Sequence, residues 1–244
     1  MLKQEFQTGV IRPVECFKEG WELIKSDYWV LFAISLVGAL IAGFSMYILL
    51  GAMLCGIYYC FLQKIDTGTV SFDGLWKGFS YFLPGLIVAL LIIVPTLFIY
   101  GIIYVPIIMA AVMGSKLSPD EFMTLFFGAV AVEIVFAFIM VCLHTLLLFA
   151  FPLIVDRNLS ALEAIKLSAK AVWNNLSGVA GLIGVSILLL IPGILTCGLG
   201  IYFLTPIMLA GFMVAYRKIF PSLDNKIYNQ PPPPNAFSGA GSYT

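Results

Sequence analysis

Charge is what this sequence has least of. Charged residues make up 11% of the chain and hydrophobic residues 61%, with a mean hydropathy of +1.03. Soluble domains carry about 25% charged residues. A soluble core formed by 244 residues could not bury so much apolar surface, so lipid is the expected solvent. The composition therefore excludes the ordinary soluble globular class.

An excess of basic residues is also absent. The 13 Lys and Arg residues balance 13 Asp and Glu residues, and arginine occurs only at Arg12, Arg157 and Arg217. Surfaces that bind nucleic acids depend on clustered positive charge, which neutralises phosphates. We therefore expect no nucleic-acid partner.

Catalytic and metal-binding motifs are missing as well. The sequence has one histidine and contains no HExxH helix, Walker phosphate loop, GxSxG turn or dinucleotide-binding fingerprint. Its five cysteines form no CxxC pair, so we interpret them as free thiols that act as small apolar residues. They are Cys16, Cys55, Cys60, Cys142 and Cys197. The sequence predicts no catalytic residue, no metal site and no cofactor, and we do not expect an enzyme.

Long apolar runs are what the sequence has in abundance. They cover 28–62, 81–113, 122–155 and 178–216. A helix needs about 20 residues to cross the hydrocarbon core. The two middle runs each fit one crossing, whereas the first and last are long enough for two and contain glycine or proline breakers near the middle. The runs predict an all-α membrane protein with six transmembrane helices, over about 28–43, 46–62, 81–110, 122–152, 178–194 and 198–216. Residues 1–226 would form a single polytopic membrane domain.

The basic residues support this count. With the N-terminus in the cytoplasm, six crossings place every Lys and Arg except Lys116 on the cytoplasmic side, as the positive-inside rule requires. Four or five crossings separate the charges less cleanly. The pattern predicts a protein of the bacterial inner membrane with both termini in the cytoplasm. Because the first 25 residues are mixed polar and amphipathic, we expect the first span to act as its own insertion signal.

Three short segments have apolar residues at helical spacing and a tryptophan near the start of a predicted span. The tryptophans are Trp21, Trp76 and Trp173. In the third segment the apolar face is Leu162, Ile165, Ala169, Val172 and Trp173. Ser71 and Ser160 are expected helix caps, the second in a capping box with Glu163. We expect three amphipathic helices in the cytoplasmic interface with the tryptophans as anchors. They indicate a weak threefold internal repeat; the alternative is that they are ordinary connectors.

Two ionisable residues lie inside the fourth predicted span, Glu133 and His144. Eleven residues make about three helical turns, so the two side chains share a face roughly 16 Å apart. Tyr100 and Tyr104 of the third span are possible partners. Ionisable groups in a membrane suggest function, which predicts a polar track for protons or cations. The alternative is structural: Glu133 bonded to a tyrosine or protonated, and His144 a neutral donor between helices.

Asp156 and Arg157 follow the fourth predicted span. We expect them to pair, or Asp156 to cap the turn, in a structural role.

The C-terminal segment differs from the rest. Residues 227–244 are rich in proline, glycine and serine and contain the run Pro231, Pro232, Pro233 and Pro234. Four prolines favour a polyproline II conformation, and the Gly/Ser end is flexible. We interpret this cytoplasmic tail either as a passive stub or as a docking segment for a protein partner.

Two stretches resemble a known family. One covers Leu50–Leu62 and Ser71–Phe79. The other begins at Phe151, carries the pattern P-x-x-x-D-x-x-x-S-x-x-E-A-x-x-x-S over 152–168, and continues to Pro206 and the pair Tyr216-Arg217. They are similar to a broad bacterial family of six-span integral membrane proteins of unknown function, which is itself similar to the membrane domain attached to some glycerophosphoryl diester phosphodiesterases. The resemblance implies a fold and a topology. The phosphodiesterase catalytic domain is absent from this chain, so the resemblance does not imply that activity.

These observations favour a non-enzymatic membrane scaffold or accessory subunit of a membrane complex. Its partners would be membrane lipid and a protein bound through the tail or the interfacial helices. The alternative is a small transporter or channel for a lipid-like or protonatable solute, which would use the track of Glu133 and His144.

Overall fold

The computed structural model describes residues 6–112, 118–196 and 198–222, and these residues form helices and no strand. In chain order the helices are α1 (Pro13–Ile24), the 3-10 helix η1 (Lys25–Asp27), α2 (Tyr28–Phe44), α3 (Leu50–Thr67), the 3-10 helix η2 (Phe72–Tyr81), α4 (Phe82–Val112), α5 (Pro119–Leu146), α6 (Ala150–Arg157), α7 (Ala161–Asn174), α8 (Leu176–Leu195) and α9 (Leu199–Ile219). The predicted all-α class is confirmed.

Five helical stretches are long and apolar enough to cross a membrane. They are Pro13–Phe44, Phe72–Val105, Met123–Arg157, Leu176–Leu195 and Leu199–Ile219. Each contains most of one predicted crossing. The predicted crossing over 46–62 is not among them. Residues 45–49 form a turn in which Met46 and Tyr47 have positive φ, and the helix that follows, α3, extends to Lys64 and Asp66 at its polar end.

Helix α3 lies at the centre of the molecule. Ten of its side chains are buried, and it packs against α2, η2, α4 and α6. The approach to η2 is close enough that only glycine fits. A Cβ atom on Gly56 would collide with the carbonyl oxygen of Leu75, and one on Gly78 with the carbonyl oxygen of Ala52. Small residues therefore let the two backbones touch.

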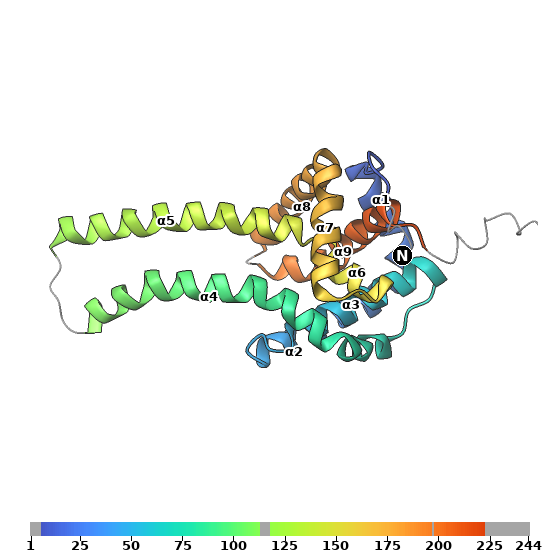
Figure 1. Ribbon diagram of the computed structural model, residues 1–244, viewed down its shortest axis with the longest axis horizontal. Coiled ribbons are helices and arrows are strands. Elements are labelled where there is room, and N and C mark those ends of the chain that lie inside the picture. The colour runs from blue at the N-terminus through green and yellow to red at the C-terminus, as the bar shows by residue number, and fades with distance from the viewer. Residues whose placement is uncertain (1–5, 113–117, 197, 223–244) are drawn as a thin grey trace, which may run out of the picture.

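The three predicted interfacial segments form α1, η2 and α7. The expected caps are present, because Ser71 Oγ accepts from the amide of Asp73, and Ser160 and Glu163 form the capping box. The second segment is a 3-10 helix, stabilised by i to i+3 hydrogen bonds. Figure 1 shows α7 running crosswise to α4 and α5.

The buried face of α7 differs from the predicted one. Five of its six buried residues lie outside the predicted apolar face: Ala161, Ala164, Leu167, Ser168 and Ala171. Of the predicted face only Val172 is fully buried, whereas Leu162 and Trp173 are 65% and 72% exposed. Small residues pack inward because α7 lies close to α5 and α6, and the larger apolar side chains are left facing outward.

The arrangement of these segments is cyclic. Each leads into a long helix, and each packs on the helix that precedes it in the cycle: η2 on α3, α7 on α5 and α6, and α1 on α9, the last helix of the cycle. Three buried small residues occupy matching positions, Gly20, Gly78 and Ser168, each five residues after an acidic residue. The three segments are thus packed in similar ways, and the predicted threefold repeat of interfacial helix and span stays a prediction.

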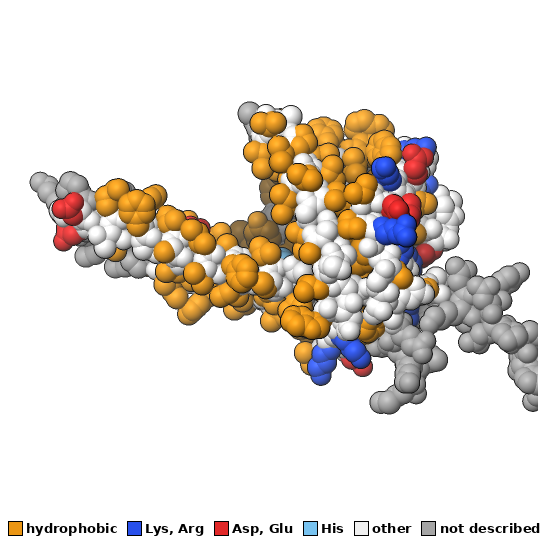
Figure 2. Space-filling model, turned by 90° about the horizontal axis from the view of Figure 1, so that it is seen from above, with side chains coloured by type: hydrophobic (Ala, Val, Ile, Leu, Met, Phe, Trp, Pro, Cys, Tyr) orange, Lys and Arg blue, Asp and Glu red, His pale blue; other side chains and the backbone are white. Residues whose placement is uncertain are grey.

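Helices α4 and α5 form a hairpin that projects far beyond the rest of the molecule (Figure 1). They have 31 and 28 residues, which correspond to about 46 and 42 Å, whereas α8 has 20 residues, about 30 Å. We call the hairpin of α4 (Phe82–Val112) and α5 (Pro119–Leu146) the arm, and its end next to the other helices the base of the arm. Figure 2 shows hydrophobic side chains covering the arm.

Candidate functional site

The ionisable residues predicted to form a polar track lie on the arm and at its base. Glu133 is near the middle of α5 and partly exposed, and it makes no hydrogen bond or ion pair with any residue that the structure describes. His144 is in the last turn of α5. Its Nδ1 lies 2.7 Å from the carbonyl oxygen of Met140. Because a carbonyl oxygen only accepts, Nδ1 is the donor in this hydrogen bond.

The two tyrosines do not complete the track within the described residues. Tyr100 and Tyr104 are neighbours on α4, with ring centroids 5.6 Å apart, and they are 46% and 43% exposed. Neither hydroxyl forms a hydrogen bond to Glu133 or to another described side chain. The four residues therefore share one hairpin without a hydrogen bond between them.

The three predicted anchors are surface residues of the segments that precede long helices. Trp21, Trp76 and Trp173 are 41%, 46% and 72% exposed. Trp21 meets the ring of Tyr28 edge-on at 5.8 Å, and Trp76 stacks on Phe79 at 6.2 Å. The indoles of Trp21 and Trp76 are thus presented at the surface next to a second aromatic ring. The predicted docking prolines, Pro231 to Pro234, lie outside the described residues.

A cluster of charges joins the polar ends of three helices. Arg217 of α9 donates from Nη2 to Asp156 of α6 at 2.7 Å and from Nε to Asp66 of α3 at 2.8 Å. Asp156 also accepts from the hydroxyl of Tyr216 at 2.7 Å and from Nε of Arg157 at 3.0 Å. We call these five residues the ion cluster. The predicted pairing of Asp156 with Arg157 is confirmed.

The ion cluster is largely shielded from solvent. The side chains of Arg217 and Asp156 are 12% and 13% exposed. Arg157 extends the network by donating to the carbonyl oxygen of Pro221 at 2.8 Å. Charges removed from water need compensation. Each carboxylate oxygen of Asp156 has a donor, whereas Nη1 of Arg217 is buried without a hydrogen-bond partner among the described residues. The cluster is therefore a structural junction between the polar ends of α3, α6 and α9.

Further ion pairs lie at the same end of the molecule. Lys64 near the end of α3 contacts Asp27 before α2, and Lys218 of α9 contacts Glu19 of α1. Figure 2 shows the Lys and Arg side chains gathered at the end of the molecule opposite the tip of the arm. The hairpin of α2 and α3 thus starts and ends at one level.

Sequence reasoning missed Asp66 and Arg217. They are separated by 151 residues, and no local pattern pairs them. The available signal was that predicted spans two, four and six all end in charged residues on the same side of the membrane. Among the described residues, no group of three or more His, Cys, Asp or Glu side chains is placed to hold a metal ion.

No protein-family model, curated protein or solved structure matches this chain.

Proposed function

We propose that this protein is a non-enzymatic scaffold of the bacterial inner membrane, which holds a protein partner through the arm of α4 and α5. The observation that carries the proposal is the large apolar surface of the arm. Leu97 and Phe98 of α4 are 65% and 69% exposed, and Ile134 and Phe138 of α5 are 65% and 71% exposed. Beyond its base the arm has no other described helix to cover it.

Lipid can cover only part of this surface. A hydrocarbon core is about 30 Å thick, and α4 is about 16 Å longer when it stands upright, which is roughly ten residues. Tilting of α4 would shorten the part of the helix that extends beyond the hydrocarbon core. A protein partner packed on the arm would cover the apolar side chains that remain outside the core. Glu133 adds a second reason, because a carboxyl group on an apolar helix favours a hydrogen-bonding partner from another chain.

The proposed topology has six crossings with both termini in the cytoplasm. Two ion pairs support it. Lys64 with Asp27 joins the end of α3 to the start of α2, and Arg217 with Asp66 joins the end of α9 to the end of α3, so these helix ends lie on the same side of the proposed membrane. In this topology α3 is the crossing that the five long apolar stretches do not include. Neighbouring helices cover α3, so it needs less apolar surface than a span that is exposed to lipid. The resemblance of residues 152–168 to the bacterial six-span family is a further reason.

Photo-crosslinking tests the proposed partner surface. A photoreactive amino acid replaces Phe98 or Phe138 on the arm, or Leu188 of α8, which is 65% exposed and serves as the matched control. In native membranes, the two arm positions are expected to crosslink one defined protein that Leu188 does not. The same experiment on a chain truncated after Lys226 separates the arm from the tail. Lipid adducts alone at both arm positions would remove the proposal.

Reporter fusions test the topology. A phosphatase that is active only outside the cytoplasm is fused after Ser45 or after Thr67. Activity after Ser45 and none after Thr67 is expected if α3 crosses the membrane. Activity at both positions would leave α3 as a non-crossing helix.

A second candidate function is a transporter for a protonatable solute, favoured by the position of Glu133 midway along α5 without a described partner. Flux in proteoliposomes tests it with Glu133→Gln and His144→Ala variants. If Glu133 and His144 relay protons, both variants are expected to lose solute flux. Unchanged flux in the two variants would exclude a relay through these residues.

A further inference from the structure

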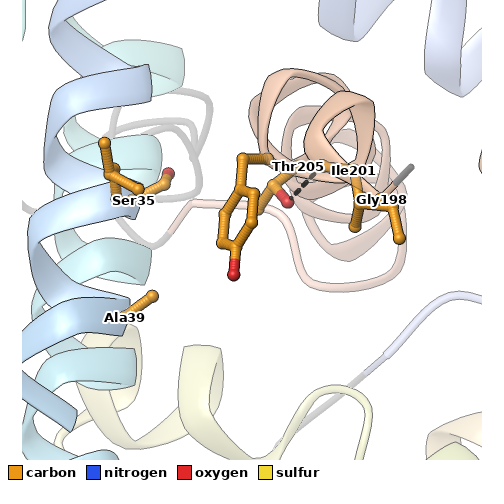
Figure 3. A pocket seen from close by; sticks show the side chains of 7 residues that line it. Ser35, Ala39, Gly198, Ile201 and Thr205 are labelled. Atoms are coloured by element: carbon orange, nitrogen blue, oxygen red, sulfur yellow. Dashed lines mark hydrogen bonds between the residues drawn. The ribbon is translucent and has the colours of Figure 1, made fainter. Parts of the chain in front are cut away.

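A cavity of about 260 Å³ lies between α2 and the first half of α9. Ser35, Leu36 and Ala39 line it from α2, and Ile201, Tyr202 and Thr205 line it from α9. Figure 3 shows Ser35 and Ala39 facing Ile201 and Thr205 across the opening.

The cavity exists because α2 and α9 touch near Phe32 and Phe203 and leave space between them next to this contact. The rings of Phe32 and Phe203 stack with centroids 4.9 Å apart and planes within 7°, and the hydroxyl of Tyr28 donates to the carbonyl oxygen of Phe203 at 2.6 Å. Further along α2 the residues facing α9 are the small Ser35 and Ala39, which leave the space unfilled.

The lining is apolar with one free donor. The hydroxyls of Ser35 and Thr205 donate within their own helices, to Leu31 at 2.8 Å and to Ile201 at 2.9 Å. The hydroxyl of Tyr202 forms no hydrogen bond with any described residue, and its side chain is 51% exposed. A hydroxyl at membrane depth is stabilised by an acceptor, so a ligand with one oxygen acceptor and an apolar body fits this lining.

The depth of Tyr202 indicates the ligand. Arg217 and Lys218 in the last turn of α9 mark one polar boundary. Tyr202 lies fifteen residues before Arg217, or about 22 Å along the helix, in a core about 30 Å thick. Tyr202 therefore lies within the hydrocarbon core, and the hydrogen-bond acceptor that a membrane glycerolipid carries next to its acyl chain is the ester carbonyl. Exposed apolar side chains flank the cavity, including Leu40 at 49% and Leu199 at 67%, so its entrance faces hydrocarbon.

We propose that this cavity binds one acyl chain of a membrane glycerolipid, whose ester carbonyl accepts a hydrogen bond from the hydroxyl of Tyr202. The inference requires α2 and α9 to cross a bilayer. It does not depend on the arm binding a partner.

A photoreactive lipid tests the site. The full-length protein is reconstituted with a glycerophospholipid that carries a diazirine in its acyl chain, irradiated, and analysed by peptide mass spectrometry. Peptides covering 35–39 and 201–205 are expected to be labelled several-fold more than the equally apolar surface of α8. Equal labelling of all lipid-facing helices would mean an ordinary lipid shell and would overturn the proposal.

Variants make the test specific. Ala39→Phe fills the cavity and is expected to lower labelling of 201–205 several-fold, whereas Val30→Phe, at a 37% exposed position of α2 that neither lines nor flanks the cavity, is expected to leave labelling unchanged. Tyr202→Phe keeps the ring and removes the donor. The expected drop in lipid affinity is about 2- to 10-fold, the range of one hydrogen bond. Labelling of the arm should not change in any variant and reports that the protein is folded. Equal losses in both phenylalanine variants, or none in Ala39→Phe, would refute the site.

Discussion

At the scale of single residues, the molecule concentrates its few charges where they can compensate one another. Arg217 satisfies two carboxylates from two other helices, and Asp156 accepts from three donors. Removing one partner from such a group leaves a charge that is buried and uncompensated, which costs more than the pair contributed. The ion cluster is therefore the most sensitive point of the polar end.

Arg217→Gln is expected to lower the free energy of unfolding by about 3–5 kcal/mol, because it leaves Asp156 buried without its main cationic partner. Thermal unfolding in detergent measures this, with a thiol-reactive dye reporting exposure of the buried Cys16, Cys55 and Cys60. Lys218→Gln is the matched control. Its ion pair with Glu19 is more exposed, so we expect a loss below about 1 kcal/mol. Equal losses in the two variants would contradict a special role for the cluster.

A pH dependence is expected at the start of α7. Hydrogen bonds from the side chain and backbone of Ser160 lower the pKa of Glu163. A carboxyl group with a lowered pKa in the folded state stabilises it above the unfolded-state pKa, which is about 4.3. That contribution is lost as the pH falls through the folded-state value. After correction for the intrinsic exchange rate at each pH, the protection of the first turn of α7 should therefore fall on acidification below about pH 4. Glu163→Gln should exchange with less dependence on pH, and an unaltered pH profile in this variant would contradict the assignment.

At the scale of helices, close approach decides which ones can pack. The contact of η2 with α3 brings backbone against backbone, at Gly56 and Gly78. A methyl group there has no space, and the atoms it would strike belong to the backbone, so neither helix can adapt by rotating a side chain.

Gly78→Ala is expected to destabilise the protein by about 1–3 kcal/mol or more, because its methyl group forces η2 away from α3. Gly184→Ala on α8 is the matched control, since a Cβ atom there meets nothing within 4 Å. Alanine is also favoured over glycine in a helix by about 1 kcal/mol. The control should be neutral or slightly stabilising. The same thermal unfolding assay compares both, and a harmless Gly78→Ala would show that η2 is free to move.

At the scale of the whole molecule, a polar end, a central helix and a projecting arm have different surroundings. The body is fastened by the ion cluster and by the close packing of α3, whereas the arm is held only at its base. Its protection in the membrane must therefore come from lipid or from a partner.

Hydrogen exchange on the protein in lipid nanodiscs should divide the arm. Residues 84–94 at the base of α4 are expected to exchange slowly, because lipid and the body cover them. Residues 103–112 and 119–128 are expected to exchange faster, because about ten residues of each helix extend beyond a bilayer of about 30 Å. Addition of the crosslinked partner should slow them. Uniform protection of the arm without a partner would indicate that it lies tilted within the bilayer.

The sequence alone determined the helical class, the helix caps and the approximate positions of most long helices. These follow from local physics, because hydrophobic runs of about 20 residues and capping side chains act within one segment. It was less successful with α3, which is buried among other helices and is not among the stretches apolar enough to cross a membrane, and with α7, where small residues face the body. Only the tertiary structure placed Asp66 beside Arg217 and opened the cavity between α2 and α9. Both features join segments more than 150 residues apart, and no local pattern specifies which distant helix ends or faces will meet.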